Sequence, residues 1–246
     1  MSHPLPDGVD LEACLFGGQA FTWWSADDTI EGLTRGTRVS IDPVRGTWTS
    51  TPDRDEGFLA AYLGRERTRP RALAEDPDLG ALARRMPGLR LLDQDPWEGT
   101  LAFMISPANN VPRIQATIAK LCRRLGDPVD GTAAVPGPQA VADAERPIEA
   151  AHDRLVELDG VGPKVAECIL CYALGFDRAF PVDRWVARAG EHLLGEEPTT
   201  EAARQRWGDD AAMAQQVVFH GARKGYVDGI EASPVAGFDA WRSVEV

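Results

Sequence analysis

The segment that most restricts the fold of this chain is Leu158-Asp-Gly-Val-Gly-Pro-Lys-Val-Ala166, where two helical patterns flank a short turn with two glycines. The first N–H groups of a helix have no partner inside the helix, and the helix dipole makes this end positive. Such a turn can bind an anion, and Gly160 and Gly162 leave room for a phosphate. The pattern predicts a helix-hairpin-helix that holds a nucleic-acid backbone through Gly160, Val161 and Gly162.

Lys164 follows this turn directly, and Pro181-Val-Asp183 lies 19 residues further along the chain. Residues 165–180 are predicted to form one apolar helix and a short loop, so an antiparallel return would bring Asp183 near Lys164. A neutral amine is a nucleophile, and burial can lower the pKa of a lysine by several units. A carboxylate beside it can stabilise a cationic sugar and move protons. Two simpler interpretations stay open: many non-catalytic hairpins contain Gly-Val-Gly-Pro-Lys, and Asp183 can cap the next helix.

The chain is predicted to be mainly helical with a small antiparallel sheet, which is an α+β fold. Short segments rich in Thr, Trp, Val and Ile predict strands at Ala20–Trp24, Thr29–Thr34, Arg38–Ile41 and Thr47–Thr51. Apolar spacing predicts helices around 58–63 and over Leu73–Met86, Trp97–Ile105, Pro112–Leu125, Ile148–Leu158, Lys164–Leu174, Val182–Leu194 and Asp210–Arg223. Asp127–Arg146 is rich in Pro, Gly and Ala and predicts a loop with one short helix. We expect a sheet domain with flanking helices over residues 1–85 and a helical domain over residues 86–246.

The four cysteines, Cys14, Cys122, Cys168 and Cys171, are too few and too scattered for a disulfide framework. Cys168 and Cys171 form a CxxC, but no second pair completes a four-thiolate site for zinc or an iron–sulfur cluster. We expect two reduced cysteines one helical turn apart and no iron–sulfur cluster.

The formal net charge of −12 is unusual for a protein that binds nucleic acid. Three lysines stand beside 23 arginines. An acidic, lysine-poor composition suggests a salt-rich cytoplasm, where the Debye length at about 1 M salt is only ~3 Å; a GC-rich genome is the alternative. Net charge governs solubility and does not exclude a local DNA site. No apolar run is long enough for a membrane helix, and the first residues lack the pattern of a secretory signal. We therefore expect a cytoplasmic protein without membrane contact, associated with the nucleoid through DNA.

The hairpin followed by Pro-Val-Asp resembles the helix-hairpin-helix, Gly-Pro-Asp superfamily of DNA glycosylases, and within it the 8-oxoguanine DNA glycosylase/AP-lyase branch. The resemblance extends over much of the chain through Gly17–Trp23, Leu92–Glu98 and Ser106–Arg113. It implies that Lys164 is the Schiff-base lysine and that Asp183 is the catalytic aspartate.

The same resemblance implies a pocket for the flipped base. Gly18 matches the glycine whose carbonyl recognises N7–H of 8-oxoguanine, a donor where guanine has an acceptor. Cys168 and Phe219 match the two faces that sandwich the base, and Gln215 matches the group that recognises its Watson–Crick edge. Lys164 and Cys168 are four residues apart, as are Gln215 and Phe219, so each pair shares one helix face. Core packing for Cys168 and Phe219, and a solvated helix face for Gln215, are the alternatives.

For DNA contact, the resemblance implies Asn109 and Asn110 near the gap left by the flipped base. The family's own asparagine aligns with Ala108. Arg113 matches the arginine that contacts the orphaned cytosine, and Trp185 replaces a frequent histidine. The stretch between Gly126 and Lys164 is shorter than in the family, which implies a reduced wedge and a preference for distorted or single-stranded sites over intact duplex DNA.

The resemblance implies a base-excision-repair enzyme that acts on damaged DNA as a monomer. It needs no organic cofactor, and a cation at the hairpin backbone is allowed. Two alternatives stay open: an alkylated-base glycosylase that uses Asp183 alone, and a non-catalytic DNA-binding protein.

Overall fold

The computed structural model describes residues 1–64, 70–106, 111–135, 152, 155–156 and 161–233. The strands are β1 (His3–Pro4), β2 (Trp23–Ala26), β3 (Thr29–Thr34), β4 (Thr37–Asp42), β5 (Thr47–Thr51), β6 (Pro128–Val129) and β7 (Thr132–Ala133). The helices up to the hairpin are α1 (Leu11–Leu15), α2 (Gly57–Tyr62), α3 (Pro70–Leu73), α4 (Gly80–Arg84), α5 (Pro96–Ile105) and α6 (Val111–Leu125). After it come α8 (Pro163–Tyr172), α9 (Arg184–Leu194), α10 (Thr200–Trp207), the short 3-10 turn η1 (Gly208–Asp210) and α11 (Ala211–Arg223).

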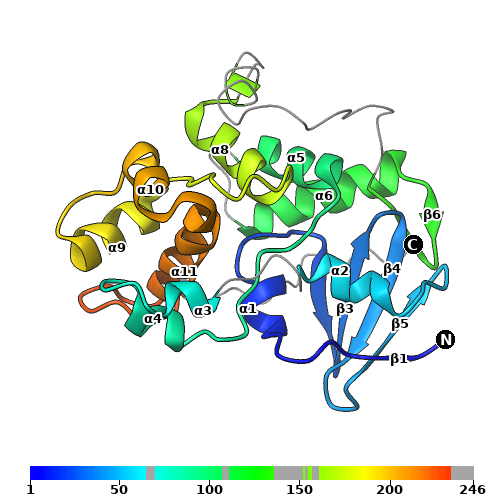
Figure 1. The fold of residues 1–246 in the computed structure, drawn as a ribbon. Coiled ribbons are helices and arrows are strands. Elements are labelled where there is room, and N and C mark those ends of the chain that lie inside the picture. Colours follow the sequence, from blue (N-terminus) through cyan, green and yellow to red (C-terminus); the bar gives the residue numbers. More distant parts are fainter. Residues whose placement is uncertain (65–69, 107–110, 136–151, 153–154, 157–160, 234–246) are drawn as a thin grey trace.

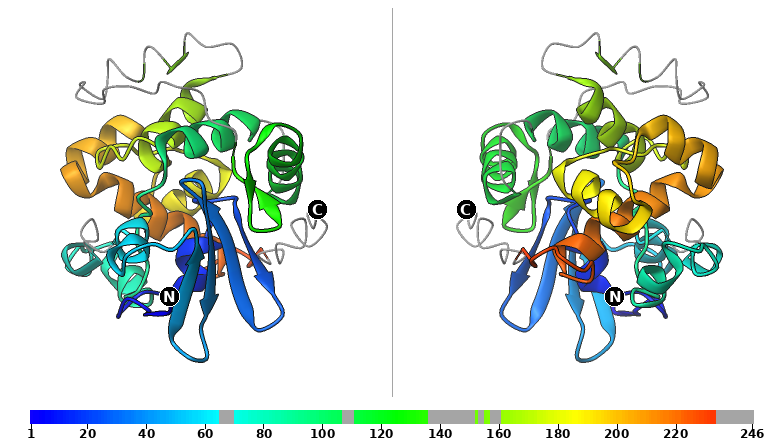
Figure 2. Two further views of the ribbon diagram at one scale, coloured as in Figure 1. Left: turned by 90° about the vertical axis from the view of Figure 1, so that its right-hand side faces the viewer. Right: turned by 90° about the vertical axis from the view of Figure 1, so that its left-hand side faces the viewer.

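The predicted α+β class is confirmed. Figure 1 shows the five-stranded sheet on one side of the molecule and α9, α10 and α11 on the other. The side views in Figure 2 show the green, yellow and orange helices toward one end of the sheet, with strand hairpins pointing away from them, and the teal helices beside the strands. The candidate site therefore lies among helices.

The main sheet is an antiparallel meander with strand order β1-β5-β4-β3-β2. Its β3 and β5 have the predicted bounds, and β4 extends the prediction by one residue at each end. Trp23 packs so closely on Gly32 of the paired strand that a Cβ at Gly32 would lie 2.3 Å from the indole. The Trp23 indole N–H donates to the Tyr62 hydroxyl at 2.7 Å, which ties the sheet to α2.

The prediction of one helix over Leu73–Met86 is wrong, because α3 and α4 are separate. Asp76 and Pro77 stand between them, and the Asp76 carboxylate accepts the N–H groups of Asp78 and Leu79 at 2.9 and 2.8 Å. A proline without an N–H, beside a carboxylate that binds the backbone, stops the helix here.

The elements that were not predicted include β1, α1, α10, η1 and the hairpin of β6 and β7. The hairpin occupies the start of Asp127–Arg146, the stretch predicted as loop with a short helix. Its turn uses Asp130 and Gly131, both with positive φ, as two-residue hairpins require. Residues 136–151 and most of the predicted helix Ile148–Leu158 lie outside the described residues. They make up much of the stretch between Gly126 and Lys164 that is predicted to be shorter than in the family.

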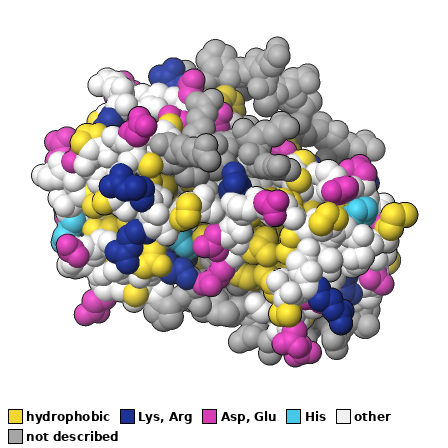
Figure 3. All heavy atoms as spheres, turned by 60° about the horizontal axis from the view of Figure 1, so that its bottom comes forward, with side chains coloured by type: hydrophobic (Ala, Val, Ile, Leu, Met, Phe, Trp, Pro, Cys, Tyr) yellow, Lys and Arg dark blue, Asp and Glu magenta, His cyan; other side chains and the backbone are white. Residues whose placement is uncertain are grey.

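One buried hydrophobic core includes side chains from both predicted domains. Helix α4 packs on α11, where a Cβ at Gly221 would lie 2.7 Å from Leu82. Because the core continues across residue 85, the division into 1–85 and 86–246 stays a prediction. Figure 3 shows acidic and basic side chains interspersed over one face. Within the described ranges, no helix has the length and hydrophobicity needed to cross a bilayer.

Candidate active site

Helix α8 begins with the residues that were predicted to bind phosphate. Gly162 has extended backbone, Pro163 is the first helical residue, and the Lys164 side chain is exposed at this positive helix end. A Cβ at Gly162 would meet nothing within 4 Å, whereas Val161 is buried in the core. A phosphate can thus reach the backbone at Gly162. Gly160 lies outside the described residues, so the complete helix-hairpin-helix stays a prediction.

Lys164, Cys168 and Tyr172 share one face of α8. Burial raises the pKa of the Cys168 thiol to about 11, while the charge of Lys164 and a hydrogen bond from its amine act in the opposite direction. The charge of Asp183 also acts on this thiol and raises its pKa. The structure therefore places Lys164 and Cys168 on one helix face, with Asp183 near enough for its charge to act on the Cys168 thiol.

Asp183 caps helix α9. Its Oδ1 accepts the N–H groups of Trp185 and Val186, each at 2.9 Å. The capping interpretation is confirmed, and it places the carboxylate at a fixed position beside α8. Because both of these bonds use Oδ1, the second carboxylate oxygen of Asp183, Oδ2, takes no part in the cap.

Gly18 and Phe219 are in contact across the site. Gly18 has a φ of +88°, and a Cβ there would lie 3.0 Å from Cε1 of Phe219. The guanidinium of Arg223, four residues after Phe219, lies 5.7 Å from the centroid of its ring. Burial lowers the pKa of Arg223, and the charge of Asp183 opposes this effect. Arg223 therefore connects the predicted pocket to Asp183; we missed it in the sequence, although the four-residue spacing places it beside Phe219.

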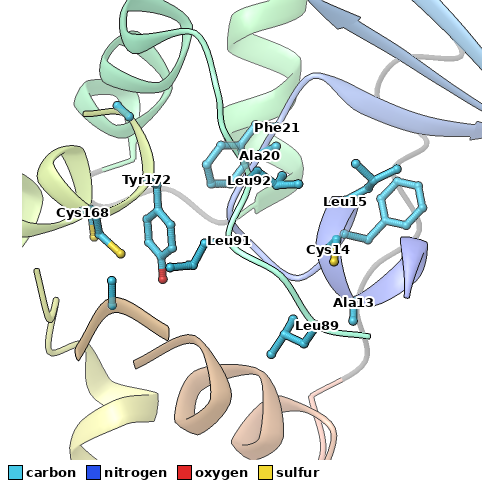
Figure 4. Close-up of a cluster of buried hydrophobic side chains, with 14 of the residues drawn as sticks. Ala13, Cys14, Leu15, Ala20, Phe21, Leu89, Leu91, Leu92, Cys168 and Tyr172 are labelled. Carbon is cyan, nitrogen blue, oxygen red and sulfur yellow. The ribbon is translucent and has the colours of Figure 1, made fainter. Parts of the chain in front are cut away.

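Gln215 is buried, with 2% of its surface exposed, so the solvated-face alternative is wrong. Its Nε2 donates to the carbonyl of Pro181 at 3.1 Å, and its Oε1 accepts from the Tyr172 hydroxyl at 2.5 Å. Figure 4 shows Cys168 and Tyr172 side by side on α8, with the Tyr172 hydroxyl pointing away from the helix. Tyr172 was not predicted, although it lies four residues after Cys168 on the same helix face.

Glu167, three residues after Lys164, connects α8 to the segment of Phe180 and to α10. Its Oε2 accepts the N–H of Phe180 at 3.0 Å, and its Oε1 accepts from Arg204 of α10 at 2.7 Å. The Thr200 hydroxyl donates to the carbonyl of Phe180 at 3.0 Å. Phe180, in the segment that leads to Asp183, is therefore hydrogen-bonded through both its N–H and its carbonyl oxygen.

Two hollows lie beside these residues. One, of about 470 Å³, is lined in part by Lys164, Val182 and Arg204. The other, of about 430 Å³, is lined in part by Trp185 and Arg188 of α9. Both have the size of sites that bind small molecules or parts of larger ligands. The first borders the predicted catalytic residue Lys164, and the second borders Trp185, a predicted DNA contact.

Among the other predicted DNA contacts, Arg113 is exposed near the start of α6 and Trp185 is half-buried in the first turn of α9. Asn109 and Asn110 lie outside the described residues. All four cysteines are buried free thiols, and Cys168 and Cys171 both belong to α8, as predicted for reduced cysteines. Among the described residues, no group of three His, Cys, Asp or Glu side chains could hold a metal ion.

No protein-family model matches the chain. Over 84 residues it is 40% identical to the probable N-glycosylase/DNA lyase of Methanothermobacter thermautotrophicus, which covers 32% of this chain and 27% of that protein. It is 28% identical over 201 residues to N-glycosylase/DNA lyase OGG1 of Arabidopsis thaliana, covering 59% of this chain and 55% of the relative. It is also 26% identical over 164 residues to the N-glycosylase/DNA lyase of Saccharomyces cerevisiae, covering 46% and 44%. The chain thus spans about half or less of each relative.

Solved structures match most of the chain. MBOgg1 in complex with a low-affinity DNA ligand superposes with a TM-score of 0.78 and 24% identity, over 89% of this chain and 93% of that one. Clostridium acetobutylicum 8-oxoguanine glycosylase/lyase, bound to double-stranded DNA with cytosine opposite 8-oxoguanine, superposes with a TM-score of 0.74 and 23% identity, over 89% of this chain and 93% of that one. The chain has the fold of the 8-oxoguanine DNA glycosylases. A 3-methyladenine DNA glycosylase from Archaeoglobus fulgidus superposes with a TM-score of 0.66 and 20% identity, over 90% of this chain and 98% of that one. The glycosylase fold alone therefore leaves the base unassigned.

Proposed function

We propose that this protein is a base-excision-repair DNA glycosylase that removes 8-oxoguanine through a Schiff base on Lys164 and also cleaves abasic sites. The observation that carries the proposal is that Lys164 and Cys168 share one face of α8 and that the charge of Asp183, at the start of α9, acts on the same thiol, because this combines a candidate nucleophile with a carboxylate. The names of the sequence relatives, all N-glycosylase/DNA lyases, support the same reaction.

In the proposed reaction, the damaged base enters between Cys168 and Phe219, where the Gly18 carbonyl accepts its N7–H. Bound DNA excludes water from Lys164, whose neutral amine is the nucleophile. The amine attacks C1′, the C1′–N9 bond breaks, and the base leaves with the electron pair and takes up a proton. The Asp183 carboxylate stabilises the cationic sugar. The attached amine loses a proton, and the C1′–O4′ bond breaks with proton uptake at O4′, which opens the sugar and gives the Schiff base. Loss of a proton from C2′ then expels the 3′ phosphate.

DNA contact is proposed to begin at the hairpin, where the backbone of Gly160, Val161 and Gly162 holds a phosphate, with a bridging cation allowed. Asn109, Asn110, Arg113 and Trp185 are proposed to contact the strands near the lesion. The monomeric state and the cytoplasmic, nucleoid-associated location stay predictions.

The acidic composition leads us to propose a salt-rich working environment. The net charge of −12 would repel DNA at low ionic strength, whereas a Debye length of ~3 Å at about 1 M salt confines this repulsion to close contacts. Binding of a lesion-bearing duplex should therefore tolerate about 1 M salt. A steep loss of binding over that range would leave the GC-rich genome as the explanation of the composition.

The likeness to the 3-methyladenine glycosylase keeps an alkylated-base enzyme as a second candidate. Such an enzyme would act through Asp183 alone and would leave abasic sites intact. The position of Lys164 one helical turn before Cys168 on α8 favours the lysine mechanism, because it places the amine beside the predicted base pocket.

Borohydride trapping tests the proposal on an oligonucleotide with 8-oxoguanine opposite cytosine, in high salt. Wild-type protein should form a covalent adduct, Lys164→Gln should form none, and Lys120→Gln, which changes an exposed lysine of α6, should react like wild type. Excision without trapping would support the alkylated-base candidate, and tight binding without either product would support a non-catalytic DNA-binding protein.

A further inference from the structure

The side-chain amide of Gln215 is held in one orientation by two neighbours. Its Nε2 lies 3.1 Å from the carbonyl oxygen of Pro181, and its Oε1 lies 2.5 Å from the Tyr172 hydroxyl. A backbone carbonyl only accepts hydrogen bonds, so the NH₂ end of the amide must face Pro181. The oxygen end then faces Tyr172, and the hydroxyl must donate to it.

The Tyr172 hydroxyl is itself fixed in position. The ring is buried and stacks on Phe103, with centroids 5.2 Å apart and planes at 18°. Burial raises the pKa of Tyr172 well above 10, so the hydroxyl keeps its proton. Gln216 Oε1 is a second acceptor at 3.0 Å. One proton makes one strong bond, and the shorter distance assigns it to Gln215.

This orientation matters because turning a glutamine amide over exchanges the positions of its NH₂ donor and its oxygen acceptor. The Watson–Crick edge of guanine has the O6 acceptor beside the N1–H and N2–H donors. The edge of adenine has the N6–H donor beside the N1 acceptor. A glutamine that turns freely can pair with either edge, whereas an amide held by Pro181 and Tyr172 keeps one arrangement of donor and acceptor.

We propose that Tyr172 determines base specificity by positioning Gln215, so that the pocket selects a guanine-type edge over an adenine-type edge. Tyr172 acts through Gln215 and takes no part in bond cleavage. This inference rests on the proposed function, because it assigns a role within the pocket of the same enzyme.

Tyr172→Phe tests the inference, since it removes the hydroxyl and keeps the ring that stacks on Phe103. The substrates are duplexes with 8-oxoguanine or 8-oxoadenine, which share N7–H and O8 and differ at the Watson–Crick edge. We expect kcat/KM on 8-oxoguanine to fall about 10-fold or more, and the ratio of the two values to fall with it, because the Gln215 oxygen loses its buried donor. Cleavage at a preformed abasic site, which contains no base, should not change.

Phe103→Leu is the matched control, because it alters packing on the same ring and keeps the hydroxyl. It should retain the wild-type ratio of 8-oxoguanine to 8-oxoadenine. A wild-type ratio in Tyr172→Phe would overturn the inference, and so would a parallel loss of abasic-site cleavage. If the wild-type protein neither excises 8-oxoguanine nor cleaves an abasic site, the proposed function itself fails. This outcome concerns the wild-type protein and is therefore distinct from the two Tyr172→Phe results.

Discussion

The carboxylate of Glu167 accepts the backbone N–H of Phe180 at 3.0 Å, a bond between residues 13 positions apart. Glu167 stands three residues after Lys164, and Phe180 stands three residues before Asp183. This bond therefore connects the helix that carries the candidate nucleophile directly to the segment that carries the candidate carboxylate. Arg204 binds the other carboxylate oxygen, and the two side chains are only 7% and 13% exposed.

Glu167→Gln should lower the free energy of unfolding by about 3 kcal/mol, because Arg204 loses a countercharge that water cannot replace. Urea unfolding would measure the change. Arg204→Met and the double variant complete a cycle in which the double variant should lose less stability than the sum of the two single variants. Strictly additive losses would show that the pair does not act as a unit.

Asp183→Asn should separate folding from chemistry. Asparagine also caps helices, so the free energy of unfolding should stay within a few tenths of a kcal/mol of wild type, whereas Asp183→Ala should lose about 1 kcal/mol with the bonds to Trp185 and Val186. Both variants should lose base excision, because neither carries a negative charge at this position. Excision by Asp183→Asn at the wild-type rate would remove Asp183 from the catalytic residues.

Gly18→Ala should damage base recognition more than stability. Its positive φ costs about 1–2 kcal/mol for alanine, and the new Cβ also displaces Phe219. Gly195→Ala is the control, since Gly195 has a φ of +79° with open space around it and incurs the backbone cost alone. We expect excision of 8-oxoguanine to fall about 10²-fold in Gly18→Ala, with little change in Gly195→Ala. Equal activities in kinetic assays would contradict a pocket at Gly18.

Acid should destabilise the protein through His220, which is buried beside the loop of Gly17. Burial lowers the pKa of His220 from 6.5 to about 4. The unfolded chain takes up the proton first, so this stability is present above pH 6.5, declines as the pH falls toward 4 and is absent below it. The loss amounts to roughly 3 kcal/mol. His220→Gln should show a smaller decline between pH 7 and pH 4 in urea unfolding, and parallel curves for the two proteins would exclude His220 as the cause.

The local features of this protein could be predicted from the sequence. Strands β3 and β5, helices α5, α8, α9 and α11, and the pairing of Lys164 with Cys168 all follow from periods of two or 3.6 residues. These periods reflect contacts within a few residues, which a short segment contains in full. The break at Pro77 was also local, and its turn chemistry was a usable signal.

The partners of the site residues were decided by the tertiary structure. Tyr172 donates to Gln215 across 43 residues, and Arg204 reaches Glu167 across 37. Gly18 meets Phe219 from opposite ends of the chain. A buried polar group binds whichever partner the packing of the whole chain places beside it, and no spacing along the sequence specifies that partner. The sequence by itself determined which helices carry the candidate chemistry, and only the packed fold decided that Tyr172 donates to Gln215 and that Arg204 binds Glu167.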